Sequence, residues 1–186
     1  MQITNSKTAY GWANIALHWI AAIGVIVLYL YGDKSAEAPT RELKLALRAE
    51  HVSIGVLLFV FLAARVVWSL TQPKPEKLAK GKWVGLLAKT VQYLFIAMIA
   101  VQIVTGPLLI WSTAHSLKVF DWFEIPTPFS APNRGLHEIL ETTHKWSAKL
   151  LWPLLILHAL GALKSLFIDR DRTLQRMLWV RRAPGV

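Results

Sequence analysis

The sequence predicts an all-α integral membrane protein, a single domain over residues 1–186 in which four helices form a bundle. Its apolar fraction is 54% and its mean hydropathy is +0.41, which is high for a soluble protein of this size. The apolar residues gather in four runs, each near or above the ~20 residues that a helix needs to cross about 30 Å of hydrocarbon. The net charge is +10, but the charges lie between these runs and form no continuous stripe, which argues against nucleic-acid binding.

Each predicted span is bounded by residues that interrupt or anchor a membrane helix. Breakers separate the runs at Gly32 to Pro39, at Gln72 to Pro75, and at the prolines of 126–132. We expect the spans at about 14–31, 51–70, 85–111 and 146–167. Tryptophans near their ends fit an aromatic belt; these are Trp12, Trp68, Trp83, Trp111, Trp122 and Trp146. The connection 112–145 is long, and we expect a lid, a short interfacial helix or a surface segment that packs over the helix ends.

The orientation follows from the Lys and Arg residues in the connections. The N-terminus, the 71–84 connection and the tail after 167 carry ten cations and three acids, whereas 32–50 and 112–145 carry seven cations and eight acids. This difference predicts that both termini face the cytoplasm. The cations of the first set are Lys7, Lys74, Lys77, Lys80, Lys82, Arg170, Arg172, Arg176, Arg181 and Arg182.

Four of the six histidines fall at matched depths in the predicted spans. His18 lies in the cytoplasmic part of the first span, and His51 and His144 open the second and fourth spans on the outer side. His158 follows His144 by 14 residues, about 21 Å along the axis and on the same helix face. Depth therefore pairs His51 with His144 and His18 with His158.

Ionisable side chains inside a membrane span are costly and are functional candidates. Two opposed imidazoles across a helical bundle can ligate a haem iron from both sides. The chain has no cysteine, which excludes iron–sulfur clusters and covalently attached haem, and thus favours haem b. One alternative is that each histidine is a hydrogen-bonded interhelical residue. Another is a zinc or copper site, which would need clustered ligands at one depth. We expect His115 and His137 to be solvated residues of the outer connection.

The sequence resembles the bacterial cytochrome b561 family, which is related to the cytochrome b subunits of hydrogenases and formate dehydrogenases. The resemblance covers nearly the whole chain. It rests on Leu17-His18-Trp19, Glu50-His51-Val52-Ser53-Ile54-Gly55, Phe61-Leu62-Ala63-Ala64-Arg65, Thr143-His144-Lys145-Trp146, Leu157-His158-Ala159 and the tail from Asp169-Arg170-Asp171. It implies a multi-pass protein of the bacterial inner membrane with two haem b groups per chain, whose four iron ligands are His18, His51, His144 and His158.

Three further residues in the spans are candidates for roles near the cofactors. Arg65 lies 14 residues after His51, at the depth of the cytoplasmic-side pair, where a guanidinium could bind a haem propionate or extend to the headgroups. Gly55 follows His51 by about one turn and could leave room for a haem. Gln102 could bond a neighbouring helix or serve a quinone, and Gly106-Pro107 should kink the third helix.

The expected function is electron transfer, because haem saturated by two histidines has no open position for oxygen or substrate. The leading hypothesis is a di-haem oxidoreductase that links ubiquinone or another quinone to an outer-face partner. Superoxide:ubiquinone oxidoreductase is the specific candidate that the resemblance suggests. The alternative is a cytochrome b subunit that takes electrons from a docked periplasmic dehydrogenase. The length of the chain favours a stand-alone cytochrome. The expected partners are membrane lipid, quinone, and either superoxide or a periplasmic redox protein.

Overall fold

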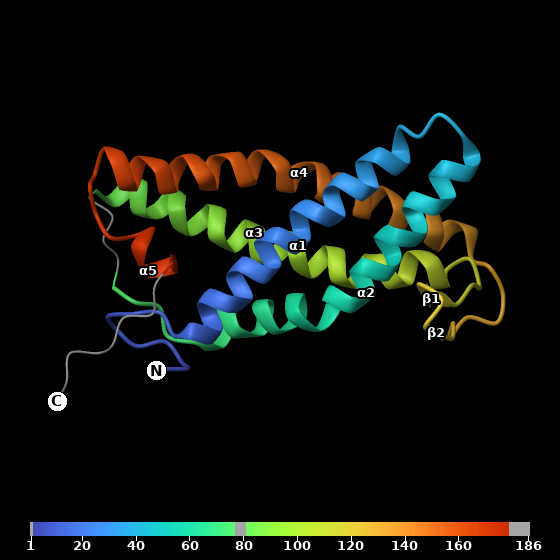
Figure 1. Ribbon diagram of the computed structural model, residues 1–186, viewed down its shortest axis with the longest axis horizontal. Coiled ribbons are helices and arrows are strands. Elements are labelled where there is room, and N and C mark those ends of the chain that lie inside the picture. The colour runs from blue at the N-terminus through green and yellow to red at the C-terminus, as the bar shows by residue number, and fades with distance from the viewer. Residues whose placement is uncertain (1, 77–80, 179–186) are drawn as a thin grey trace.

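The computed structural model describes residues 2–76 and 81–178, and four long helices dominate this part of the chain (Figure 1). Each is long and apolar enough to cross a membrane. The helices are α1 (Trp12–Ala36), α2 (Arg41–Thr71), α3 (Lys82–Trp111) and α4 (Arg134–Phe167), with a short α5 (Gln175–Leu178). The prediction of a membrane bundle of four helices is consistent with this architecture. Of the cations used for the orientation, Lys77, Lys80, Arg181 and Arg182 lie outside the described residues.

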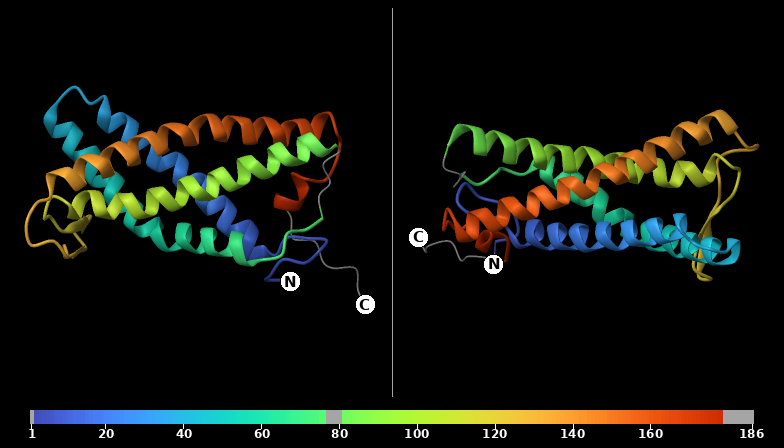
Figure 2. Two further views of the ribbon diagram at one scale, coloured as in Figure 1. Left: turned by 180° about the vertical axis from the view of Figure 1, so that it is seen from behind. Right: turned by 90° about the horizontal axis from the view of Figure 1, so that it is seen from above.

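The helices pack as two antiparallel pairs whose backbones are not equally close. Close backbone contacts join α1 to α2 and α3 to α4, and fewer join α2 to α3. Figures 1 and 2 show the α1–α2 pair inclined to the α3–α4 pair. A small apolar core of Ala21, Leu62 and Ile99 joins α1, α2 and α3. By contrast, α4 approaches α1 and α2 mainly through its side chains, which becomes important at the site.

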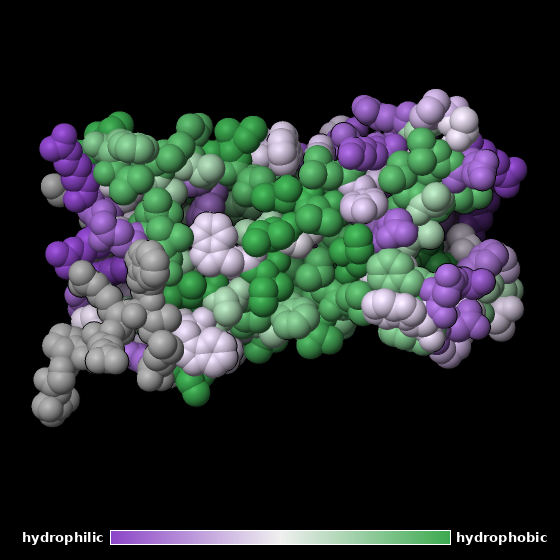
Figure 3. Space-filling model, in the orientation of Figure 1, coloured by the Kyte–Doolittle hydropathy of each residue, from purple (hydrophilic) through white to green (hydrophobic). Residues whose placement is uncertain are grey.

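The surface matches a membrane environment. Figure 3 shows a broad apolar band across the middle of the visible face, with hydrophilic residues gathered at its two ends. Exposed tryptophans fit the predicted belt at Trp12, Trp83, Trp122 and Trp146. Trp68 and Trp111 differ, because each indole nitrogen is enclosed by protein. Both residues are half-buried, so their indole nitrogens cannot reach the headgroups as a belt residue would.

Two helices begin well before the spans that hydropathy predicts. Thr40 caps α2 by accepting a hydrogen bond from Leu43 N (3.2 Å), and Asn133 caps α4 by accepting one from Leu136 N (3.0 Å). Both capping residues follow a proline, and such side chains satisfy the free N–H groups of a first turn. His51 and His144 therefore lie ten residues inside their helices and do not open them. The extra turns are polar, so hydropathy alone does not detect them.

The two ends of the bundle are built differently. At one end, hydrogen bonds join three segments: the N-terminal segment, the segment that follows α2, and α5. Glu76 N donates to Lys7 O and Arg176 Nη1 donates to Glu76 O, each at 2.8 Å. We call this the α5 end. The opposite end holds the α1–α2 turn, which spans only residues 37–40, and a β-hairpin (Figure 1). We call it the hairpin end.

The hairpin is the part of the fold that the all-α prediction missed. Strand β1 (Leu117–Val119) pairs antiparallel with β2 (Phe123–Ile125). Val119 is completely buried, and Phe120 N donates a hydrogen bond to Ser53 Oγ on α2 (2.8 Å). Of the outcomes expected for the 112–145 connection, a segment packed over the helix ends fits this arrangement best.

Candidate functional site

The four histidines of the spans lie in two facing pairs. The rings of His51 and His144 have centroids 6.2 Å apart, at the hairpin end of the bundle. The rings of His18 and His158 have centroids 6.0 Å apart, toward the α5 end. Each pair joins α4 to a helix of the other antiparallel pair. We call them the hairpin-end pair and the α5-end pair.

The spacing within each pair suits one metal ion between two rings. A histidine nitrogen binds a transition metal at about 2 Å and lies about 1 Å from its ring centre, so two rings on opposite sides of one ion should be about 6 Å apart. Two rings joined by a direct N–H···N hydrogen bond would have centroids only about 5 Å apart, closer than in either pair. Among the described residues, no group of three His, Cys, Asp or Glu side chains could hold a metal. Two-histidine ligation from opposite sides, as haem requires, therefore fits this donor set.

The position of the pairs in the bundle also fits a large planar group. Both pairs bridge α4 to α1 or α2, and these helices have little close backbone contact with α4. The separation between the pairs follows from the 14 residues between His144 and His158, which is about 21 Å along a helix. Each pair therefore has its own level in the membrane.

In the hairpin-end pair, the Nδ1 atom of each ring has a hydrogen-bond partner. His51 Nδ1 lies 2.8 Å from Leu28 O on α1, and a carbonyl oxygen only accepts, so this Nδ1 carries the proton and donates it. His144 Nδ1 lies 2.9 Å from Thr105 Oγ1 on α3. Such partners fix the tautomer of a metal-binding histidine and leave Nε2 as the ligand atom.

Glycines of neighbouring helices lie against the same two rings. A Cβ on Gly32 of α1 would lie 3.4 Å from His51 Cε1, and a Cβ on Gly106 of α3 would lie 3.6 Å from His144 Cε1. Gly32 was expected to break the first helix, but it lies within α1, which continues to Ala36. Gly55, singled out in the sequence, is half-buried, and a Cβ there would meet only Leu28, at 3.7 Å.

The α5-end pair has different surroundings. Trp19 meets His18 edge-on with ring centroids 5.4 Å apart, and Phe95 meets His158 at 5.6 Å. Within the part of the chain that the structure describes, neither histidine has a hydrogen bond from its ring. Each of these two rings thus lies against an aromatic side chain, whereas each ring of the hairpin-end pair has a hydrogen-bond partner.

Arg65 lies close to the α5-end pair. It is half-buried on α2, and its charge interacts with both His18 and His158. Its Nη1 donates to Asn14 Oδ1 on α1 (3.0 Å), and Asn14 is itself buried. This contact keeps the guanidinium inside the bundle, which favours a role at the cofactor level over extension to the headgroups.

Several other polar residues have structural partners of their own. Gln102 bonds a neighbouring helix, because its Nε2 donates to His144 O (2.9 Å) and Ser147 Oγ (2.7 Å). Lys164 is paired with Asp169 at 2.6 Å. Of these, Gln102 matters most here, since it attaches α3 to the backbone of a predicted ligand.

The remaining histidines, His115 and His137, were both expected to be solvated loop residues, and the structure agrees for only one of them. His115 is exposed, as predicted. His137 was expected in a solvated loop, but it lies in α4 and is half-buried. Its Nδ1 approaches Ser112 Oγ at 3.0 Å and Leu109 O at 3.2 Å. The prediction for His137 is wrong because the capped start of α4 lies before it.

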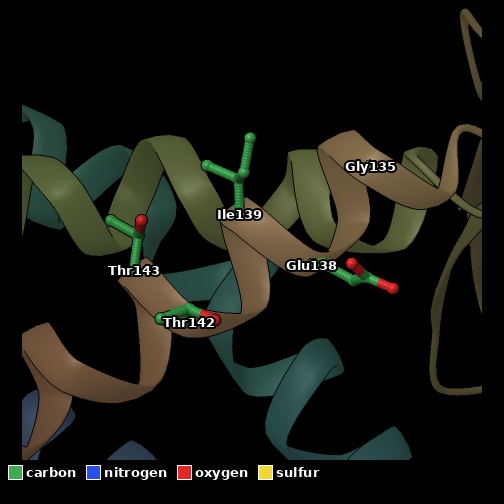
Figure 4. A pocket seen from close by; sticks show the side chains of 5 residues that line it. All are labelled: Gly135, Glu138, Ile139, Thr142 and Thr143. Carbon is green, nitrogen blue, oxygen red and sulfur yellow. The ribbon is translucent and has the colours of Figure 1, made fainter.

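An open groove at the hairpin end of α4 is separate from the histidine pairs. Figure 4 shows its lining side chains, which all come from the first turns of this helix. They include Glu138, which forms an exposed ion pair with Arg134 at 2.9 Å. The groove contains neither histidine of the hairpin-end pair, so we do not assign it to the cofactor site.

Comparison with known proteins bears on nearly the whole chain. The model of the family described as prokaryotic cytochrome b561 matches residues 9–179. Cytochrome b561 homolog 2 of Escherichia coli (strain K12) is 31% identical over 96% of this chain and 95% of its own. The probable superoxide oxidase CybB of Yersinia pestis is 26% identical over 91% of this chain and 95% of its own. Cytochrome b561 homolog 1 of Escherichia coli (strain K12) is 23% identical over 89% of this chain and 94% of its own.

Proposed function

Because this chain belongs to the prokaryotic cytochrome b561 family, we propose that it binds two haem b groups and links the quinone pool to an outer-face redox partner. The chain is a multi-pass protein of the bacterial inner membrane, and we propose that residues 1–186 act as one functional domain. Haem b, when bound between two histidines, supplies one-electron chemistry without an open position for oxygen.

The observation that carries the proposal is the spacing of the two histidine pairs. Centroid distances of 6.0 and 6.2 Å suit one metal ion between each pair of rings. His51 and His144 would hold one haem, and His18 and His158 would hold the other. Gly55 would contribute space one turn from His51. Arg65 would neutralise a propionate at the α5-end pair, since a buried carboxylate needs a charged or hydrogen-bonding partner.

We further propose that the α5 end faces the cytoplasm and the hairpin end faces outward. The support is the excess of Lys and Arg in the connections of the α5 end. These segments would also lie near anionic lipid headgroups, which attract basic residues. The hairpin-end pair would then serve the outer partner, and the α5-end pair would lie closer to the cytoplasmic leaflet.

Quinone is the partner that needs least from the protein surface. The described cytoplasmic-side segments are short, and none forms a domain on which a soluble enzyme could dock. A quinone instead approaches laterally from the lipid. On the outer side, superoxide is the specific candidate donor, which is supported by the 26% identity to a protein named probable superoxide oxidase.

The quinone link is tested by stopped-flow spectroscopy. Purified protein, reduced and returned to lipid, is mixed with a short-chain ubiquinone, and haem reoxidation is followed against a quinone-free control. We expect reoxidation well above the control rate. Equal rates would contradict the quinone link and favour the alternative, a cytochrome subunit served by a periplasmic dehydrogenase. Superoxide generated by xanthine oxidase then tests the outer donor, with superoxide dismutase added as the control.

A further inference from the structure

Helix α3 carries no histidine of either pair, yet it contacts one predicted ligand at three points. Thr105 Oγ1 lies 2.9 Å from His144 Nδ1, Gln102 Nε2 donates to His144 O, and Gly106 lies against the ring. Consecutive turns of α3 thus meet both the backbone and the ring of His144. Neither His18 nor His158 has such an arrangement among the described residues.

The direction of the hydrogen bond at Thr105 follows from the partners of its hydroxyl. Thr105 Oγ1 lies 2.7 Å from Val101 O, one turn earlier in α3. A carbonyl oxygen only accepts, so the hydroxyl proton is directed to Val101 O. The lone pairs of Oγ1 are then left for His144, whose Nδ1–H must be the donor. The chain of donors runs from His144 through Thr105 to the backbone of α3.

Burial of Thr105 protects its hydrogen bond with His144 from competition by water. Thr105 is 6% exposed, and Thr105 is β-branched, which restricts its side chain in a helix to few rotamers. Water has little access to compete for Oγ1. An imidazole that donates from Nδ1 has a fixed tautomer and a more basic Nε2. Thr105 acts in this way on His144, whereas His51 has Leu28 O as its acceptor.

We propose that Thr105 is a positioning residue for His144: its hydroxyl fixes the tautomer and raises the electron-donating strength of this ligand at the hairpin-end haem. The proposal rests on the proposed function, because it needs a haem between His51 and His144. A stronger donor favours the oxidised iron. Thr105 would therefore lower the tendency of the hairpin-end haem to be reduced and leave the other haem unaffected.

The test uses Thr105→Val, which keeps the shape of the side chain but removes the hydroxyl. Redox titration of the purified holoprotein in lipid should show one haem titrating at a higher potential, with its reduction equilibrium constant raised up to about tenfold, or about 59 mV for one electron. The second haem should be unchanged. The low-spin electron paramagnetic resonance signal of the same haem should shift.

Two variants control for a merely structural effect. Thr105→Ser keeps the hydroxyl and should restore the native potential and signal. Thr113→Val removes the same kind of hydroxyl, which contacts Ile110 O (2.7 Å) and His115 Nδ1 (3.0 Å) at a half-buried position away from both histidine pairs, and should change neither haem. Loss of the hairpin-end haem from Thr105→Val with retention in Thr105→Ser would also support the role of the hydroxyl.

Failure of the proposal and failure of the proposed function give different results. Two haems with the same potentials and signals in native protein and Thr105→Val would overturn the role of Thr105 alone. Equal loss of haem in Thr105→Val and Thr105→Ser would overturn it too, because the hydroxyl would not be the cause. Native protein with no haem at the hairpin-end pair would overturn both.

Discussion

The two histidine pairs have nearly the same ring spacing but are held in different ways. At the hairpin end, each ring donates to a fixed acceptor, Leu28 O or Thr105 Oγ1. At the α5 end, the rings of His18 and His158 are bordered by Trp19 and Phe95, with the half-buried Arg65 nearby. The comparison shows that nearly the same ring spacing can be reached either by polar anchoring or by aromatic packing and charge.

This difference should have chemical consequences if both pairs bind haem. Donation from Nδ1 strengthens a histidine ligand and favours oxidised iron. A nearby cation such as Arg65 stabilises the reduced, less positive site. The two ends are thus arranged to separate the potentials of two otherwise similar sites, with the α5-end site the more easily reduced.

The largest expected effect comes from removing single ligands, which tests whether the pairs are independent. His51→Ala and His144→Ala should each lose the same haem and leave the other spectrum intact. His18→Ala and His158→Ala should lose the second haem. Reduced-minus-oxidised spectra of the four purified variants provide the measurement. If the spectrum of His51→Ala matched that of His158→Ala, the pairing would be wrong.

A second change tests the packing at the hairpin end. Gly32→Leu should place a side chain against the ring of His51, since even a Cβ there would lie 3.4 Å from Cε1. Overpacking in such a contact typically costs about 1–3 kcal/mol, so we expect loss of much of the hairpin-end haem alone. Gly135→Leu, at the exposed start of α4, is the control and should retain both haems. Equal loss of both haems from Gly32→Leu would point to general misfolding.

Arg65→Gln tests the charge at the α5 end. Loss of the cation should make the α5-end haem harder to reduce, and a tenfold fall in its reduction equilibrium constant corresponds to about 59 mV. This shift is opposite in sign to that expected for Thr105→Val and falls on the other haem. Redox titration measures it, with Arg48→Gln at the exposed start of α2 as the control for the α5-end haem. An unchanged potential would favour the headgroup role of Arg65.

The smallest effect, on thermal stability, is expected from a change in the segment between α4 and α5. Trp19, the neighbour of His18, donates from its indole to Met177 O (2.8 Å), and Asp171 shapes the turn that leads to this segment. Burial raises the pKa of Asp171, but hydrogen bonds from Ser165 and Thr173 outweigh it and lower the pKa below the usual 3.8. Because the folded pKa is the lower one, the stabilisation is present above pH 3.8 and is lost as the pH falls through the folded value.

Asp171→Asn should therefore reduce the melting temperature slightly at neutral pH, by about 1–2 °C. The difference from native protein should disappear below the folded pKa. Thermal denaturation monitored by circular dichroism measures this, with Asp121→Asn at the exposed hairpin as the control. A difference that persisted at low pH would mean that the carboxylate charge is not the cause.

The sequence predicted the parts of the fold that follow from hydropathy and spacing. The four spans follow from the lengths of the apolar runs, and the meeting of His18 with His158 and of His51 with His144 follows from the depth of each histidine in its span. The early starts of α2 and α4 were missed because their first turns are polar, although Pro39-Thr40 and Pro132-Asn133 are recognisable start signals. The wrong expectation for His137 had the same cause.

The surroundings of the ligands could not be predicted in the same way. The sequence pointed to Gly55 on the same helix as His51, whereas the glycines against the rings, Gly32 and Gly106, come from neighbouring helices. Likewise, nothing in the local sequence assigns Thr105 to His144, because their contact depends on how α3 and α4 pack. The hairpin strands are three residues each, too short for an alternating pattern to be distinctive.

The central claim, two independent haem sites formed by the two histidine pairs, is tested most directly by counting haem in double variants. Pyridine haemochrome per polypeptide should give two for native protein and one for His51→Ala/His144→Ala, because both changes affect one site. It should give none for His51→Ala/His158→Ala, because this combination breaks both sites. A count of one in the second double variant, or none in the first, would contradict the assignment of the pairs.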